Sequence, residues 1–584
     1  MKTHALAVCG LVLLAFGGAA HAQNAPNGHT PEVLIMQAGG DRLMEDLQYL
    51  LTLTTPQQQA QWKTIKDWVE EMFLPGIDGK LPIGVDVILS NDATRYRPQF
   101  PIKNLQDFRN NLNAYGIPSR KKTASLYQLE KGFEGYLRYR HGYAIIGERD
   151  SDVPLTVPNP QVDLVPLVQA GFDAALRLRN DPQGMDPRRN DFQRIRKDLL
   201  ASVKQNPDET KEDFEVRRTL VEHQLNELER FYVESRYALL GWTTDSRQQE
   251  GRLDITLEPI AGSSLAAAID LLNQAPSHFA NVPKAQDSIL SLRVNHPLDP
   301  MRKQHAADFV KVLRPSLERR VEDDKDRSDE EKKAGKQVVE MIAGMIDAGA
   351  QAGRAEFVVE VATRQSGKRA LVAGVRSVDG NKVHDIVQLL PAARKTRKVQ
   401  MDVAKVGETR IHQVDLDFDQ PAILQDFYGQ DLALFVGGDK DAVWFATGEK
   451  ALDDLKAAIA AVGQPNAGKQ DDPFVDLAIK LGPWVDLRSQ LDPIQPKAKP
   501  AARPRPAPAR GEARTPVADE LTPEIDRSQL RKLALEAFAA GDDVLTLQLT
   551  RKDKDVAGKL SVQRGVLRMV GKGLAQFSEE NLAE

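Results

Sequence analysis

A single cysteine in 584 residues is the feature that most constrains how this chain can fold. Cys9 lies inside an N-terminal stretch, Ala5–Ala20, whose residues are almost all apolar or small. A weakly basic start, this apolar run and the small-x-small pattern Ala20-His21-Ala22 are typical of a secretory signal peptide. We therefore expect cleavage between Ala22 and Gln23, and Cys9 leaves with the signal.

Removing residues 1–22 from the 584 leaves a mature chain of 562 residues without a cysteine. Such a chain has no disulfide and no cysteine-ligated zinc, so packing of its core must stabilise it outside the cytoplasm. The apolar run is shorter than the roughly 20 residues that span a bilayer, and Cys9 precedes its centre, unlike a lipoprotein cysteine. We expect a secreted or periplasmic protein that has no transmembrane segment after processing.

The composition excludes a general nucleic-acid binder and allows large cores. Hydrophobic residues make up 41% and charged residues 28% of the chain, and the formal net charge is −5. A nucleic-acid-binding protein carries a basic face, which this acidic balance does not favour. The length predicts several lobes, and mixed helix and strand patterns predict an α+β fold.

Two stretches predict lobes built from an antiparallel sheet and helices. The first is 23–155, where 23–33 are expected to be a flexible leader before the first helix. The second is 354–492, which opens with a hairpin whose turn is Ser366-Gly367. Strand, helix and several short strands follow in the same order in both, and Tyr143–Gly147 has a counterpart in Val443–Gly448. This order suggests an internal duplication; a generic α+β sequence is the alternative.

Residues 156–353 predict a helix-rich middle that contains one β-hairpin. Ser328 and Glu331 have the spacing of a capping box, and the helix that they open is expected to reach about Gly353. Four of its side chains are expected to face the core, and four small residues are expected to permit close packing. The first set is Val338, Met341, Ile342 and Met345; the second is Gly344, Ala348, Gly349 and Ala352.

Residues 493–516 are rich in proline and carry six cations against one acid, Glu512. This composition predicts an extended, disordered segment. Its local charge of +5 suits contact with an anionic component of the cell envelope, although a solvated linker also explains it. A helix, a hairpin and a final helix are expected in 517–584.

Searches for catalytic motifs give near-misses only. Gly463–Lys469 has phosphate-loop spacing, but Gln470 replaces the hydroxyl residue and a helix precedes the segment. Ser119-Arg120-Lys121-Lys122 matches Ser-x-x-Lys, but the partner motifs of penicillin-recognising enzymes are missing. The sequence also has neither Gly-x-Ser-x-Gly nor His-Glu-x-x-His. We expect no cofactor, and the chain favours a non-catalytic protein.

A weak candidate metal site is the alternating run Asp415, Asp417 and Asp419, followed by Asp426. The spacing resembles a calcium loop, but Gln420 stands where the sharp turn needs glycine. The alternative is a strand whose aspartates face water while Val414 points to the core. Of the ten histidines, eight remain after processing, and none has metal-ligand spacing with another; His296 and His305 are expected to be structural.

A weak candidate for binding an anionic ligand is the basic-aromatic cluster around Arg138, Arg140 and His141. A hairpin tip with arginine side chains folded back along the sheet explains the same residues.

The chain resembles a family of large secreted proteins of unknown function from bacteria with elaborate envelopes. The resemblance rests on the order and patterning of five stretches: Ile83–Leu112, Leu137–Gly147, Glu209–Leu228, Leu253–Leu272 with Gly262-Ser263, and Leu432–Ile459. It implies an exported α+β body and no particular chemistry.

These observations favour an exported binding or structural protein of the envelope. Two alternatives remain open at this point. One is a hydrolase without a recognisable motif, because paired carboxylates leave no sequence pattern. The other is a carrier of a lipid or another apolar ligand, held between sheet and helices.

Overall fold

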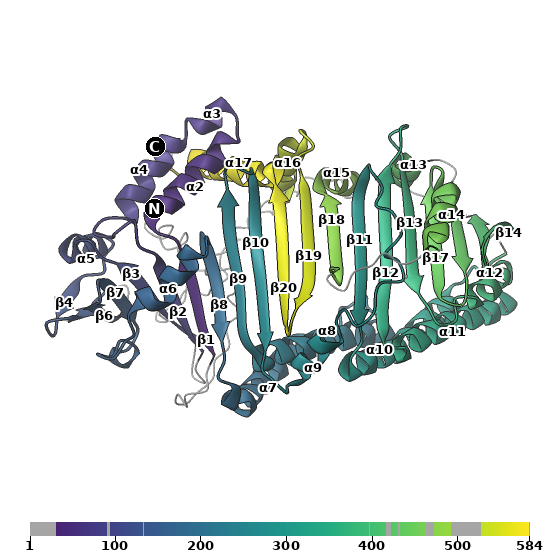
Figure 1. The fold of residues 1–584 in the computed structure, drawn as a ribbon, viewed down its shortest axis with the longest axis horizontal. Coiled ribbons are helices and arrows are strands. Elements are labelled where there is room, and N and C mark those ends of the chain that lie inside the picture. The colour runs from purple at the N-terminus through teal and green to yellow at the C-terminus, as the bar shows by residue number, and fades with distance from the viewer. Residues whose placement is uncertain are drawn as a thin grey trace, which may run out of the picture.

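The computed structural model describes residues 31–89, 94–131, 134–395, 398–415, 422–429, 432–462, 464, 472–491 and 527–582 (Figure 1). The expected cleavage site at Ala22 and Gln23, the loop 465–470 and the proline-rich segment 493–516 lie outside these residues. Within them the α+β class predicted from the sequence is confirmed.

All twenty strands of the described residues belong to one continuous antiparallel sheet. From one edge to the other, the pairings give the order β4 (Ser119–Lys121), β5 (Leu126–Leu129), β6 (Gly135–Arg140), β7 (Tyr143–Gly147), β3 (Thr94–Pro101), β2 (Ile83–Leu89), β1 (Glu32–Gln37), β8 (Ala174–Arg179), β9 (Ser235–Asp245), β10 (Glu250–Pro259), β20 (Asp555–Gln563), β19 (Val544–Lys552), β18 (Val475–Lys480), β11 (Ser288–Pro297), β12 (Arg354–Thr363), β13 (Arg369–Arg376), β17 (Ala442–Gly448), β16 (Ala433–Gly438), β15 (Thr409–Asp415) and β14 (Val399–Val406).

Helices lie along the two long edges of the sheet, across the ends of the strands (Figure 1). One side carries α7 (Met185–Ser202), α8 (Lys211–Glu234), α9 (Ser264–Leu271), α10 (Pro300–Asp323) and α11 (Asp329–Gln351), and the other carries α2 (Gly40–Thr52), α15 (Leu481–Leu491), α16 (Arg527–Phe538) and α17 (Arg564–Asn581). The remaining helices are α3 (Pro56–Gln59), α4 (Trp62–Met72), α5 (Leu105–Ala114), α6 (Pro160–Gln169), α12 (Lys382–Ala393), α13 (Ala422–Tyr428) and α14 (Ala451–Val462). Among the described helices, none combines the length and apolarity that a bilayer crossing requires.

The strands β1–β10 and β11–β20 pair in the same order. In each set of ten, the first strand pairs with the second and the eighth, and the eighth continues to the ninth and tenth. The second pairs with the third, and the third leads through the seventh, sixth and fifth to the fourth. The sets meet where β10 pairs with β20, from Glu250↔Gln563 to Leu257↔Val556. The two lobes expected from the sequence are thus the two ends of one sheet.

The sheet has two faces with different coverings. We call the face that carries Val359 and Leu547 the aliphatic face, and the other the opposite face. At the two ends, α5 and α12 pack on the aliphatic face, while α6 and α14 pack on the opposite face. The ends therefore have three layers, with helices on both sides of the strands.

Local sequence signals mark several element boundaries correctly. The Ser328 hydroxyl accepts from Glu331 N at 3.3 Å, and Glu331 Oε2 accepts from Ser328 N at 2.9 Å, which confirms the capping box. Gly367, at φ +82°, makes the expected turn between β12 and β13. This left-handed conformation favours glycine, because it lacks a Cβ.

Several strands were not predicted, among them β1, β4, β8, β11, β14 and β18. The expected leader 23–33 overlaps the start of β1 at Glu32. β1 pairs with β8 and β11 pairs with β18, far away in the sequence, so no hairpin turn marks these pairings. β4 and β14 each pair with the next strand in the sequence, and they were missed all the same.

Candidate functional site

An apolar cavity of about 600 Å³ lies between the aliphatic face and the helices α11 and α12. Its walls are almost entirely aliphatic. The lining includes Val338, Ile342, Met345, Ile346 and Gly349 from α11, Val383, Ile386, Val387 and Leu390 from α12, and Phe357, Val375, Val414, Leu434, Val436, Val443 and Phe445 from the sheet. Four polar residues, Arg354, Glu356, Arg376 and Ser377, contribute where β12 begins and β13 ends. The volume lies within the usual range of small-molecule sites.

The cavity opens to solvent beside α11. Ile342, Ile346 and Val375 line it and are 38%, 41% and 42% exposed. The expectation that Val338, Met341, Ile342 and Met345 face the core holds for Met345, which packs against the buried cluster beneath α12. Val338, Ile342 and Met345 line the cavity, whereas Met341 does not. The buried residues of α11 include Val339 and Ala343.

Of the four small residues expected to permit close packing, Gly344 and Gly349 do not serve it. A Cβ added at Gly344 or at Gly349 meets no atom within 4 Å. Gly349 lines the cavity, whereas Gly344 does not and lies on an exposed part of α11. Glycine at 349 thus leaves room in the cavity.

From the cavity, an apolar strip continues along the aliphatic face across the middle of the sheet. Through the strand register, one row of directly paired residues runs Val375, Phe357, Val294, Val475, Leu549, Gly558, Ile255, Leu240, Leu176, Ile35, Val85 and Pro98. The row beside it runs Ala373, Val359, Leu292, Leu477, Leu547, Leu560, Leu253, Trp242 and Ala174. We call these two rows the central strip.

No residue of the central strip is polar, and none is buried; all are half-buried or exposed. The opposite face of the same central strands is polar, for example at Asp254 on β10 and Gln548 on β19. Exposed apolar surface on a single chain is normally limited to patches of a few hundred Å², and larger patches mark sites of interaction. The central strip combines an apolar composition with partial exposure, and Val375 is its most exposed side chain, at 42%.

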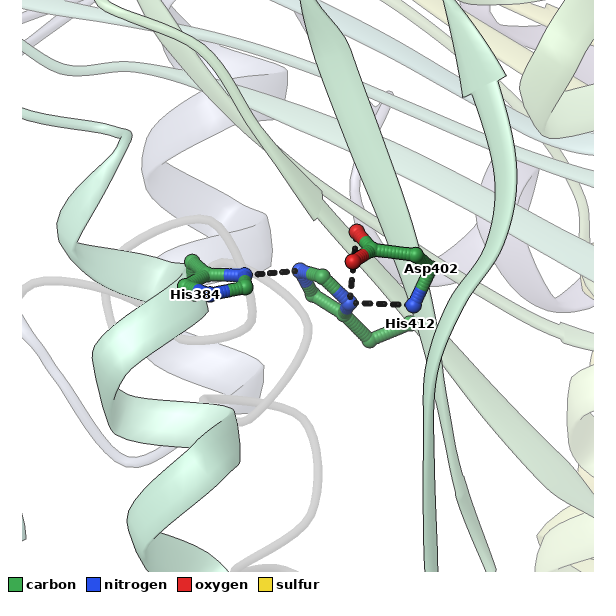
Figure 2. Close-up of side chains that lie close together, drawn as sticks. All are labelled: His384, Asp402 and His412. Carbon is green, nitrogen blue, oxygen red and sulfur yellow. Dashed lines mark hydrogen bonds and ion pairs between the residues drawn. The ribbon is translucent and has the colours of Figure 1, made fainter.

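A second cluster brings together His384 on α12, Asp402 on β14 and His412 on β15 (Figure 2). His384 Nδ1 and His412 Nε2 are 3.3 Å apart, and Asp402 Oδ1 lies 3.7 Å from His412 Nδ1. Asp402 N donates to His412 Nδ1 at 3.0 Å, from a backbone bulge in which Asp402 has φ +54°. The His412 side chain is 1% exposed, and burial together with the His384 ring lowers its pKa.

The hydrogen bonds of this cluster fix the protons on His412. Because Nδ1 accepts from a backbone N–H, the neutral ring carries its proton on Nε2, which donates to His384 Nδ1. A metal at this point needs a free lone pair on His412, and neither nitrogen offers one. The three groups are within 4.8 Å of one another, but this arrangement is that of a neutral hydrogen-bonded pair with a carboxylate beside it.

A polar cleft of about 850 Å³ lies next to His384, at the ends of β14–β17. Its charges balance: the cations are Lys382, Lys405, Arg410 and Lys440, and the acids are Asp385, Glu408, Asp439 and Asp441. The formal charges of these eight side chains therefore cancel.

The basic-aromatic cluster predicted as a weak ligand site is the tip of the β6–β7 hairpin. Arg138 is buried on β6 and donates to Val153 O, and its guanidinium also lies 3.4 Å from Asp150 Oδ1. Arg140 ends β6, and His141 is exposed in the turn with φ +51°. The three side chains thus range from buried to exposed, and the guanidinium of Arg138 is already held by protein groups.

Only Asp415 of the predicted aspartate run is described; Asp417 and Asp419 lie outside the described residues. Asp415 ends β15, and its Oδ1 accepts from Gln413 Nε2 at 3.0 Å. Val414 is buried against α12, as the strand alternative predicts. His296 Nδ1 lies 2.7 Å from Pro297 O, and His305 stacks on His223.

No direct signal in the sequence marks the cavity. Most of its lining comes from α11, α12 and five strands between residues 354 and 445, so no short motif contains it. The pair Gly344 and Gly349 is the one usable sign, and the sequence pattern alone favours close packing for it. Likewise, the separation of 28 positions between His384 and His412 matches no metal-ligand spacing.

The comparisons with known proteins give no relatives: no family model, curated protein or solved structure matches the chain.

Proposed function

We propose that this chain is an exported carrier that holds the aliphatic part of a lipid or a similar apolar molecule in the cavity between α11, α12 and the sheet. The observation that carries this proposal is the lining: aliphatic side chains surround about 600 Å³ that opens beside Ile342 and Ile346. Binding there needs no catalytic group and no cofactor.

The physical driving force is the removal from water of the apolar surface of the ligand and of the apolar surface that lines the cavity. Each buried methylene contributes about 0.8 kcal/mol, so ten methylenes contribute about 8 kcal/mol before the entropy lost on association. The lining is mainly branched aliphatic residues with two phenylalanines, which suits a flexible chain rather than a flat ring.

Export is the second part of the proposal and rests on residues 1–22, outside the described part of the chain. The resemblance to secreted envelope proteins and the cysteine-free body support it. Contact of the proline-rich segment with an anionic envelope component remains a proposal on charge alone.

We also infer that the two sets of ten strands arose by internal duplication. The identical order of strand pairs supports this inference, and so does the placement of matching helices, with α5 and α12 on one face and α6 and α14 on the other. Tyr143 and Trp444, both buried, occupy matching positions in β7 and β17, four residues before Gly147 and Gly448.

The test is binding of a fluorescent fatty acid to the purified, delipidated chain, with two matched variants. Gly349→Phe places a ring in the cavity and should abolish binding, while Gly344→Phe adds the same ring on the same helix outside the cavity. A Cβ added at either position meets no atom within 4 Å, so both substitutions start from open space on the same helix. Equal binding by the wild type and Gly349→Phe would contradict the proposal.

A further inference from the structure

The cavity is one end of a much longer apolar surface. Val375 and Phe357 line the cavity and also begin the longer row of the central strip. That row crosses twelve strands without a polar side chain, which at the spacing of strands in a sheet corresponds to about 50 Å. A single lipid chain spans about 15 Å, half of a bilayer's hydrocarbon core of roughly 30 Å. The strip is about three times longer than one such chain.

Helices border the strip on both sides where the two sets of strands meet. Leu265, Ile269 and Leu272 of α9 pack on the aliphatic face at Val556 of β20. Leu567 of α17 packs on the same face at Val562. These two contacts are six residues apart on one strand, about 20 Å, and a helix is about 10 Å across. The central strip therefore lies between the two helices. Its residues Val475 and Leu549 also pack against the cluster of α9, and Leu560 and Trp242 pack against the cluster of α17.

This geometry favours lipid chains over a protein partner. The occupant must continue into the cavity beneath α11, where the lining is the same aliphatic surface. A flexible acyl chain can pass there, whereas a helix about 10 Å across cannot follow without displacing α11 or α12. The uniform row also lacks the alternating pockets that specify side chains of a peptide strand.

We propose that the central strip binds the acyl chains of at least two phospholipid molecules side by side, in a trough that runs from the cavity across the junction of β10 and β20. The proposal rests on the proposed carrier function and deepens it: the ligand class is a row of acyl chains and not a single apolar molecule. Lipids can then move along the sheet without leaving an apolar surface.

The experiment uses single cysteines in the full chain with Cys9→Ser. Leu549→Cys places a thiol in the strip, and Gln548→Cys places one on the exposed opposite face of the same strand. The chain is incubated with vesicles of dioleoyl phospholipid, separated from them, labelled with a maleimide and counted for bound lipid by native mass spectrometry. We expect two or more lipids per chain, and labelling at 549 slowed about tenfold because the bound chains cover that thiol. Labelling at 548 should not change.

The outcomes separate the two proposals. One bound lipid that Gly349→Phe removes, with no protection at 549, would overturn the strip and keep the cavity. No bound lipid at all would overturn both. Protection at 549 without lipid, together with a dimer in light scattering, would make the strip an interface between copies and also overturn the inference. Both cysteine substitutions are small, and circular dichroism checks that the variants are folded.

Discussion

The two ends of the sheet have the same strand order, yet one is filled and the other is hollow. Beneath α5, the aliphatic face is packed with aromatic rings, among them Phe100, Phe108 and Tyr127, and the first two rings lie 5.5 Å apart. Beneath α12, the corresponding space has aliphatic side chains around a cavity. Ring-sized side chains close the first end, and smaller ones leave room in the second, so side-chain volume and not topology decides where a ligand fits.

The largest expected change in stability comes from removing a buried ring at the filled end, beneath α5. Phe108 is buried at the centre of α5, so Phe108→Ala should lower the free energy of unfolding by about 3–5 kcal/mol through lost contacts and a new cavity. Val387→Ala, at the centre of α12, should cost only about 1.5 kcal/mol, because its side chain already borders empty space. Urea denaturation measures both. Equal losses would show that the two ends are packed alike.

Ligand binding should stabilise the hollow end alone. At a free fatty-acid concentration of about 100 times Kd, the free energy of unfolding should rise by about 2.7 kcal/mol. The rise should disappear in Gly349→Phe and persist in Gly344→Phe and in Phe100→Leu, which alters only the filled end. Differential scanning calorimetry reports the shift. A rise that Gly349→Phe retains would place the ligand elsewhere.

A smaller effect distinguishes the matching aromatic residues of β7 and β17. Tyr143 donates from its hydroxyl to Pro82 O at 3.0 Å, whereas the buried indole N–H of Trp444 has no hydrogen-bond partner among the residues that the structure describes. Tyr143→Phe should cost about 1 kcal/mol for the lost hydrogen bond. Tyr96→Phe, at an exposed tyrosine, is the control and should change the free energy of unfolding far less. No difference between the two would mean that the Tyr143 bond contributes nothing.

The smallest expected effect concerns the dependence of the free energy of unfolding on pH. His412 at the hollow end is buried, and its pKa in the folded chain is lowered. As the pH falls below the ordinary histidine value of about 6.5, the unfolded chain takes up a proton before the folded one, so stability falls. His412→Asn should flatten the slope of stability against pH in this window, and His141→Asn, at an exposed turn, should not. An unchanged slope in His412→Asn would contradict the neutral hydrogen-bonded pair.

Sequence patterns correctly predicted the features that are formed by residues close together in the sequence, such as turns and helix caps. The hairpin turn at Gly367 and the capping box at Ser328 each act over a few residues, so the sequence displays them directly. Among the strands that were missed, β1 pairs with β8 and β11 pairs with β18, in each case more than a hundred residues away. β14 was missed as well, although its partner β15 follows directly in the sequence.

The site was harder to predict than the fold for a related reason. Apolar residues on α11 look the same in sequence whether they pack against a core or line a cavity. Only the position of α12 and the strands beneath shows that Ile342 faces open space. His384 and His412 lie close together because α12 packs over β15. The spacing of the two histidines in the sequence does not predict this contact.

The pairing of β10 with β20 has a consequence for how the chain matures. The strands that join the two sets, β19 and β20, follow the other strands of the sheet in the sequence and are synthesised after them. They fill the gap between β10 and β18. Until residue 563 is available, β10 and β18 are both bare edges with unpaired backbone groups, which other chains can join. A nascent or truncated chain that lacks residues 544–563 therefore has two unpaired edge strands that favour aggregation. Formation of the β19–β20 hairpin pairs both of these edges at once.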